Sequence, residues 1–260
     1  MGRQGQICIG TVLLERNRWA KPEKTPSFRA SDWAGRFAGA GFDGMELWQF
    51  HATRAAAGEV ERLADGPCPV AVFNIYPTMT DAERGTIEEC TAFAGRLGAG
   101  AVKFNVGGEP ARRGEHLDNL RRWCRDLPAG IAPLCECHPG TILEEPEAAA
   151  RFFDEPGLER CRIIVHPFSR HESLAEWLRI FGARVAHAHL QMRDPEGKRI
   201  LRFDRRPELA REAVGLMRSA GYRGSWTLEF AEGTGEPGES IEGLWATALD
   251  DLAFLRELLK

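Results

Sequence analysis

Short apolar runs recur along the chain and alternate with segments in which apolar residues are spaced three or four positions apart. The first pattern is typical of buried β-strands and the second of amphipathic helices. Several of the apolar runs are closed by Pro or Gly, as at Pro77, Gly107 and Pro167. The predicted strands span residues 7–12, 45–48, 69–76, 101–106, 131–137, 162–166, 184–190 and 225–230.

A helical segment follows each predicted strand. Thr80 and Asp81 supply an N-cap and an early acid for one helix, and Gly98 and Gly182 are typical helix stops. The predicted helices span residues 33–37, 54–64, 80–97, 115–125, 144–153, 172–181, 207–219 and 241–260.

Strict alternation of strands and helices predicts a parallel sheet, and eight such units in about 250 residues suit a closed barrel. The alternative is an open doubly wound sheet, which requires a glycine-rich phosphate loop after the first strand. The sequence Gly10-Thr-Val-Leu-Leu supplies no such loop. We therefore predict an α/β protein with a single (β/α)8 TIM barrel domain over residues 1–260.

Composition narrows the classes of partner. The chain is 43% hydrophobic and 28% charged, and its net charge of −4 offers no electrostatic support for binding nucleic acid. No apolar run approaches the roughly 20 residues that span a bilayer, and the N-terminus lacks a signal-peptide core. Seven cysteines without framework spacing favour reduced thiols. We expect a cytoplasmic protein that binds neither nucleic acid nor a membrane. The sequence is compatible with a homo-oligomer and does not determine the oligomeric state.

Candidate chemistry is sought at the carboxyl ends of the predicted strands, where TIM barrels place their working residues. Glu136 and His138 alternate with Cys135 and Cys137 just before Pro139, so the carboxylate and the imidazole share one face of a strand. An edge strand that shows its polar face to water would produce the same local pattern.

Four ionisable residues stand at corresponding ends of four successive predicted strands: Glu136, His166, His189 and Glu229. A lone histidine at a strand end is more often a surface or hydrogen-bonded residue than a metal ligand. Four such residues converging on a barrel axis instead favour a site for one divalent cation, because two carboxylates and two imidazoles offer an oxygen and nitrogen donor set.

Four stretches of sequence carry a family resemblance: GFDGMELW at 41–48, LCECHPGT at 134–141, VAHAHL at 185–190 and GYRGSWTLEF at 221–230. With them the chain resembles the xylose isomerase-like TIM barrel superfamily of sugar isomerases and epimerases, which includes the endonuclease IV branch. The resemblance implies metal ligands at Glu136, at the end of the sixth strand, at His189 and at Glu229. At the sixth strand the family usually has Asp, whereas this chain has His166.

The replacement of that Asp changes the charge around the cation. Two carboxylates and two neutral imidazoles carry two negative charges, one fewer than the family's donor set. The loss should shift preference away from Mg²⁺ and toward Mn²⁺, Zn²⁺, Co²⁺ or Fe²⁺. The alternative for His166 is that it only orients a neighbouring side chain.

A site of this kind suits removal of a proton next to a metal-polarised carbonyl. The resemblance implies that Glu136 and Glu229 act as the catalytic bases on a small sugar-like substrate. Trp48 offers an apolar wall for a sugar ring. Further candidate contacts to substrate hydroxyl or carbonyl groups are His51, Lys103, Asn105, His138, His187 and Arg193.

Phosphate recognition is ambiguous in the sequence. The loop at 232–239 is rich in glycine but carries three glutamates, which would repel an anion. The loop after the seventh predicted strand would attract one, through Arg193, Lys198, Arg199 and Arg202. The balance favours an unphosphorylated sugar, an inosose or a keto acid.

Four functions follow from these observations. The first is a metal-dependent isomerase or epimerase of a small polyhydroxy carbonyl compound. The second is a lyase or dehydratase acting on an inosose, a dehydroshikimate-like acid or a 3-keto-glycoside, which begins with the same proton abstraction. An endonuclease IV-type phosphodiesterase is disfavoured, because the second and third strand ends carry Trp48, His51, Asn74 and Tyr76 and the net charge is negative. The last is an inactive barrel that serves as a binding subunit.

Overall fold

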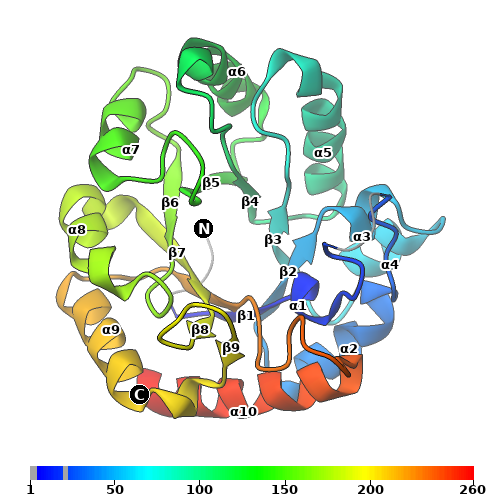
Figure 1. Ribbon diagram of the computed structural model, residues 1–260. Helices are drawn as coiled ribbons and strands as arrows, with labels where there is room; N and C mark the ends of the chain where they lie inside the picture. Colours follow the sequence, from blue (N-terminus) through cyan, green and yellow to red (C-terminus); the bar gives the residue numbers. More distant parts are fainter. Residues whose placement is uncertain (1–4, 20–22) are drawn as a thin grey trace.

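The computed structural model describes residues 5–19 and 23–260 (Figure 1). Eight strands close into a parallel barrel in the order β1-β10-β7-β6-β5-β4-β3-β2, which confirms the predicted (β/α)8 architecture. The barrel strands are β1 (Ile7–Gly10), β2 (Gly44–Trp48), β3 (Val70–Asn74), β4 (Ala101–Phe104), β5 (Ala132–Glu136), β6 (Arg162–Val165), β7 (Val185–Leu190) and β10 (Ser225–Leu228).

The longer helices form a ring outside these strands (Figure 1). They are α2 (Ala30–Ala40), α4 (Glu59–Ala64), α5 (Arg84–Arg96), α6 (Arg113–Asp126), α7 (Pro146–Phe153), α8 (His171–Phe181), α9 (Pro207–Ser219) and α10 (Ile241–Leu259). Two short helices, α1 (Thr11–Leu14) and α3 (Phe50–Thr53), follow β1 and β2. None of the helices in the described ranges is long and apolar enough to cross a membrane.

The first strand is shorter than predicted, because the strand predicted over 7–12 ends at Gly10. A Cβ at Gly10 would lie 3.2 Å from the main-chain oxygen of Leu228, so this position suits glycine. The chain then turns into α1, where the Thr11 hydroxyl accepts the main-chain N–H of Trp48 at 2.9 Å. This contact joins the ends of β1 and β2.

Two further predictions need correction. The helix predicted over 54–64 begins only at Glu59, after Gly58 with a φ of 77°, and a separate short helix, α3, precedes it and ends at Thr53. The loop after β7 contains an unpredicted antiparallel pair, β8 (Met192–Arg193) and β9 (Ile200–Leu201). Two-residue strands are too short to leave a periodic signal in the sequence.

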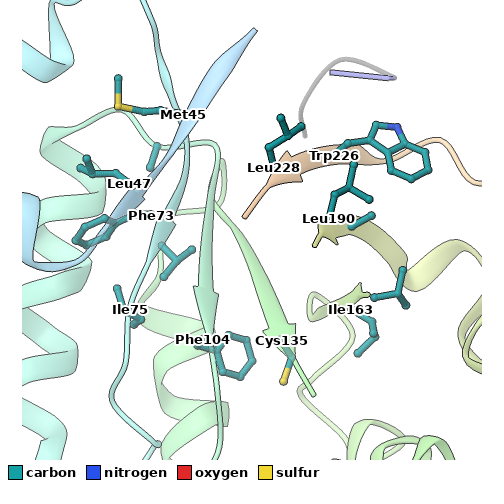
Figure 2. Packing of buried hydrophobic residues seen from close by; sticks show 14 of the residues in the cluster. Met45, Leu47, Phe73, Ile75, Phe104, Cys135, Ile163, Leu190, Trp226 and Leu228 are labelled. Atoms are coloured by element: carbon teal, nitrogen blue, oxygen red, sulfur yellow. The ribbon is translucent and has the colours of Figure 1, made fainter. Parts of the chain in front are cut away.

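Side-chain alternation along the strands divides the interior into two cores. The outward-facing residues pack against the helices (Figure 2), among them Met45, Leu47, Phe73, Ile75, Phe104, Cys135, Ile163, Leu190, Trp226 and Leu228. The inward-facing core is a small cluster of Val72, Ala101, Leu134 and Ile164. The inward-facing positions two residues after Val72, Leu134 and Ile164 are Asn74, Glu136 and His166, so polar side chains occupy the carboxyl end of the barrel interior.

A buried carboxyl group joins α10 to the loop before α9. Asp251 Oδ1 accepts the main-chain N–H of Phe203 at 2.8 Å. Its Oδ2 has no hydrogen-bond partner in the part of the chain that the structure describes. Burial is the main cause that raises the pKa of Asp251 to about 8.

We expect this carboxyl to make stability depend on pH. The folded chain keeps the Asp251 proton up to about pH 8, whereas the unfolded chain releases it near about pH 4. The unfolded state therefore binds fewer protons across that window, and the free energy of unfolding falls as pH rises. Asp251→Asn keeps an acceptor for Phe203 without the charge, so it should be more stable than wild type at pH 8 by at least about 1 kcal/mol.

Urea unfolding of wild type and Asp251→Asn at pH 5, 6.5 and 8 measures this difference. A gap between the two proteins that widens with pH is expected. The same pH slope in both would show that Asp251 is ionised in the folded protein.

Candidate active site

Four inward-facing side chains meet at the carboxyl end of the barrel. Glu136 ends β5, His189 lies in β7, and His166 and Glu229 directly follow β6 and β10. These strands are neighbours in the barrel. All four residues are buried, and one donor atom from each lies within 4.8 Å of the others. The structure therefore brings together the four residues that the sequence nominates as metal ligands.

The spacing between these groups fits a shared cation. His166 Nε2 lies 3.0 Å from Glu136 Oε1 and 3.9 Å from Glu229 Oε2. His189 Nδ1 lies 3.4 Å from one carboxylate oxygen of each glutamate. Although it is buried, this nitrogen has no hydrogen-bond partner among the described residues. A buried ring nitrogen without a hydrogen-bond partner, next to two carboxylates, is typical of a metal-binding histidine. A cation about 2 Å from each donor atom would satisfy all of them.

A fifth ionisable residue, Glu46 of β2, lies beneath this group. Its Oε2 is 3.0 Å from His189 Nε2 and 3.2 Å from His187 Nε2, and Asn74 donates to its Oε1 at 3.1 Å. With a proton on His189 Nε2 toward Glu46, the lone pair of Nδ1 faces Glu136 and Glu229. Such a carboxylate–imidazole pair fixes both the tautomer and the orientation of a metal-binding histidine.

The charges of Glu46 and its two histidines are set by one another. Burial alone would raise the pKa of Glu46, but His189 and His187 outweigh it and hold that pKa well below its ordinary value. Burial lowers the pKa of His187. Glu46 is therefore a permanent carboxylate inside the barrel, and His187 is its neutral donor.

Glu136 is held by a separate group of donors. Lys103 Nζ lies 2.6 Å from Glu136 Oε2, and Asn105 donates to the same carboxylate oxygen at 3.2 Å and to the Glu136 carbonyl at 2.9 Å. Burial would raise the pKa of Glu136, yet Lys103 and the histidine His166 hold it well below its usual range. In the same pair, Glu136 offsets the burial of Lys103 and raises the pKa of the ammonium. One oxygen of Glu136 is thus committed to Lys103, and the other faces the histidines.

Glu229 has a different and neutral partner. Gln191 donates to Glu229 Oε2 at 3.0 Å, and Arg193 in turn donates to Gln191 Oε1 at 3.1 Å. The amide of Gln191 therefore links the carboxylate of Glu229 to the guanidinium of Arg193.

A cavity of about 650 Å³ opens above this group of side chains, with Glu136 and Glu229 in its lining. Aromatic side chains form part of its wall, namely Trp19, Trp48, Phe50, Tyr76 and Phe230. Burial raises the pKa of the Tyr76 phenol to about 12, so this side chain is neutral. The candidate substrate contacts that line the cavity are Trp48, Lys103, Asn105, His138 and Arg193.

Two of the predicted substrate contacts lie elsewhere. The His51 ring is buried between Thr11 Oγ1 at 2.9 Å and Glu15 Oε2 at 3.0 Å, because residue 51 lies in α3, beyond the end of β2. His187 lies one inward-facing position deeper in β7 than His189 and is bonded to Glu46 and to Ser225. Neither residue lines the cavity.

Glu46 and Gln191 stand at the ends of the predicted second and seventh strands, where inward-facing positions can be read from periodicity, but the sequence gives neither a role. The structure places Glu46 under the four candidate ligands and Gln191 in the cavity lining, beside Glu229. Arg18 reaches the cavity from the loop after α1 and is paired with Glu239 of another loop. No pattern in the sequence marks that contact.

Comparison with protein family models and with curated protein sequences finds no match. Solved structures do match. The probable 3-DHS dehydratase AsbF from Bacillus anthracis is 16% identical with a TM-score of 0.67, over 95% of this chain and 98% of that chain. The 3-keto-D-glucoside 4-epimerase YcjR from E. coli is 15% identical with a TM-score of 0.65, over 98% and 100% of the two chains.

A third match is a xylose isomerase-like TIM barrel protein from Mycobacterium smegmatis in complex with magnesium. It is 16% identical with a TM-score of 0.60, over 99% of this chain and 98% of that chain. At such identities the matches show the fold. The chain has the xylose isomerase-like TIM barrel fold, in agreement with the resemblance seen in the sequence, and named enzymes are among the structures that share it.

The contact between Glu46 and His189 generates a prediction about metal affinity. Glu46→Gln removes the charge that holds the Nε2 proton of His189, so we expect the Kd for Zn²⁺ or Mn²⁺ to rise about 10- to 100-fold. Competition with a metal-binding dye measures the affinity. Asp251→Asn, which replaces a buried carboxyl group of α10 outside the cluster, serves as the control and should bind metal like wild type. Unchanged affinity in Glu46→Gln would contradict the orienting role.

Proposed function

We propose that the protein is a divalent-metal-dependent isomerase or epimerase of a small sugar or polyhydroxy carbonyl compound, acting by removal of a proton next to a carbonyl. The observation that carries the proposal is the convergence of two carboxylates and two imidazoles at a cavity, with the buried Nδ1 of His189 left without a partner. The fold agrees with it, because a 3-keto-glucoside epimerase and a dehydratase have similar structures.

The residues that would hold the ion are Glu136, His166, His189 and Glu229. When bound, a divalent ion supplies Lewis acidity, which polarises a carbonyl and an adjacent alcohol oxygen. With two imidazoles and only two carboxylates, this donor set favours Mn²⁺, Zn²⁺, Co²⁺ or Fe²⁺ over Mg²⁺. The M. smegmatis barrel contains magnesium. The metal preference proposed for this chain therefore rests on its own donor residues and is not taken from that structure.

The two glutamates would take and return the proton, and their surroundings differ. Glu136 shares its charge with Lys103 at 2.6 Å, which keeps its pKa low and makes it a weak base. Glu229 accepts a hydrogen bond from the neutral amide of Gln191 at 3.0 Å. We therefore assign to Glu229 the removal of the proton from the substrate and to Glu136 the second carboxylate role.

The remaining wall would orient the substrate and keep water out. Trp48 is buried and lines the cavity, and Phe50 stacks on Tyr76 with a ring separation of 6.1 Å. A pyranose or cyclohexane ring has an apolar face that such aromatic surfaces cover. Lys103, Asn105 and His138 are the donors or acceptors that face its hydroxyl groups.

A dehydratase is the second candidate, because loss of water begins with the same proton abstraction and AsbF, the probable 3-DHS dehydratase, shares the fold. The mass of the product separates the two reactions.

A phosphodiesterase of the endonuclease IV type has less support, because the cavity end of β2 carries Trp48 and Asn74 of β3 is bonded to Glu46. A barrel that only binds ligands remains an outcome of the tests below.

Exchange of substrate protons with solvent tests the proposed reaction. Protein loaded with Mn²⁺, Co²⁺ or Zn²⁺ is incubated in D₂O with a panel of ketoses and inososes, and deuterium next to the carbonyl is measured by NMR. Glu229→Gln should slow exchange at least about 100-fold, with metal content measured in parallel. Glu232→Gln, on the same loop but outside the cavity lining, should exchange like wild type.

Metal dependence is a separate prediction. Chelation should abolish exchange, and Mn²⁺, Co²⁺ or Zn²⁺ should restore it more fully than Mg²⁺ at equal concentration. Restoration by Mg²⁺ alone would contradict the assigned donor set. Exchange that survives chelation and the loss of Glu229 would contradict the mechanism itself.

A further inference from the structure

The wall of the cavity carries an excess of positive charge. Its described lining contains four cationic side chains, Arg18, Lys24, Lys103 and Arg193. The carboxylates in the same lining are Glu136 and Glu229, which are proposed metal ligands. With a divalent cation bound, the charge of the cavity would be more positive still, so an anionic group on the ligand is favoured by the field of the whole site.

Two of the four cations are neutralised by the protein itself. Lys103 is paired with Glu136, and Arg18 is paired with Glu239. The other two make no ion pair with any carboxylate in the described ranges. Arg193 donates to the neutral oxygens of Gly197 at 3.0 Å and Gln191 at 3.1 Å. Lys24 donates to the main-chain carbonyl of Arg18 at 2.6 Å.

The structure also separates Arg193 from the other basic residues of its loop. Arg199 is paired with Asp194 at 3.3 Å, and Arg202 is paired with Asp250 at 2.8 Å. Neither lines the cavity, and neither does Lys198. The segment between β7 and α9 contains six basic residues, and of these Arg193 alone lines the cavity.

The glutamates of the loop at 232–239 do not repel an anion there. None of the three lines the cavity. Glu239 is turned to Arg18 and accepts the main-chain N–H of Gly235, and Glu232 accepts the N–H of Arg202 at 3.1 Å. Phosphate sites in such barrels use main-chain N–H groups of loops like this one. Here the N–H of Gly235 already donates to a carboxylate of the protein, that of Glu239.

We propose that Arg193, assisted by Lys24, binds a carboxylate of the substrate, which makes the substrate class a sugar acid or a ring-shaped keto acid. Only Gln191 separates the guanidinium of Arg193 from the carboxylate of Glu229. The ligand would place its carbonyl near Glu229 and its carboxylate at Arg193, on either side of the Gln191 amide. The planar guanidinium matches a carboxylate in geometry. As a substrate class this rests on the proposed function, whereas the anion preference can be measured by binding alone.

Isothermal titration of the Mn²⁺-loaded protein with matched ligands tests the assignment. D-glucuronate carries the carboxylate, D-glucuronamide replaces it with a neutral group of the same shape, and D-glucose 6-phosphate carries a phosphate. We expect glucuronate to bind at least about tenfold more tightly than glucuronamide. Arg193→Gln should bring that ratio close to one, and Lys24→Met should lower it in part. Arg199→Gln, a paired arginine of the same loop, should leave it unchanged.

Equal affinities for the acid and the amide in wild type, including no binding of either, would overturn the proposal. So would an acid preference that survives Arg193→Gln. Tighter binding of glucose 6-phosphate than of glucuronate would replace the carboxylate with a phosphate. If the anion assignment holds but the proposed function fails, the result is different. The protein then prefers the acid in a way that depends on Arg193, but it exchanges no deuterium into any substrate.

Discussion

The structure depends on the compensation of charged groups buried inside a narrow barrel. Glu46, Glu136 and Glu229 are only 2%, 4% and 8% exposed, and a carboxylate so removed from water is costly unless cationic or hydrogen-bonding partners surround it. His189 lies between all three, and Lys103 meets the remaining oxygen of Glu136. Removing one member would leave a buried charge uncompensated, so the group behaves as a unit.

That constraint explains how the barrel is built around the site. The apolar cluster inside the barrel is small, and the main hydrophobic core lies outside the strands, under the helices. The fold is therefore stabilised chiefly by the outer layer. The carboxyl end of the barrel interior is left free for groups that would destabilise an ordinary core.

Much of this arrangement can be predicted from the sequence, because strand periodicity is local. Alternation places Glu136, His189 and Glu229 on inward faces, and the order of the strands makes them neighbours. The role of Glu46 depends on contacts with residues more than 140 positions away, which no local pattern contains. His51 was misplaced for a related reason: once a strand has ended, the direction of a side chain depends on the following helix.

The charged residues around the cavity show the same difference between what the sequence predicts and what only the structure shows. The sequence shows basic residues after the seventh strand and three glutamates in the last loop, but not which of them are paired. Arg193 is distinguished only by the partners that Arg199 and Arg202 find in Asp194 and Asp250. Which of these charges are paired depends on the directions of loop side chains, which the sequence pattern does not determine.

We propose above that Glu136, His166, His189 and Glu229 hold one divalent cation. Anomalous diffraction from crystals soaked in Mn²⁺ or Co²⁺ locates such an ion without any assay of activity. We expect one strong peak within about 2.0–2.3 Å of His189 Nδ1, His166 Nε2 and an oxygen of each glutamate. An absence of anomalous density at these residues in crystals grown and soaked with metal, or a peak bound elsewhere, would contradict it.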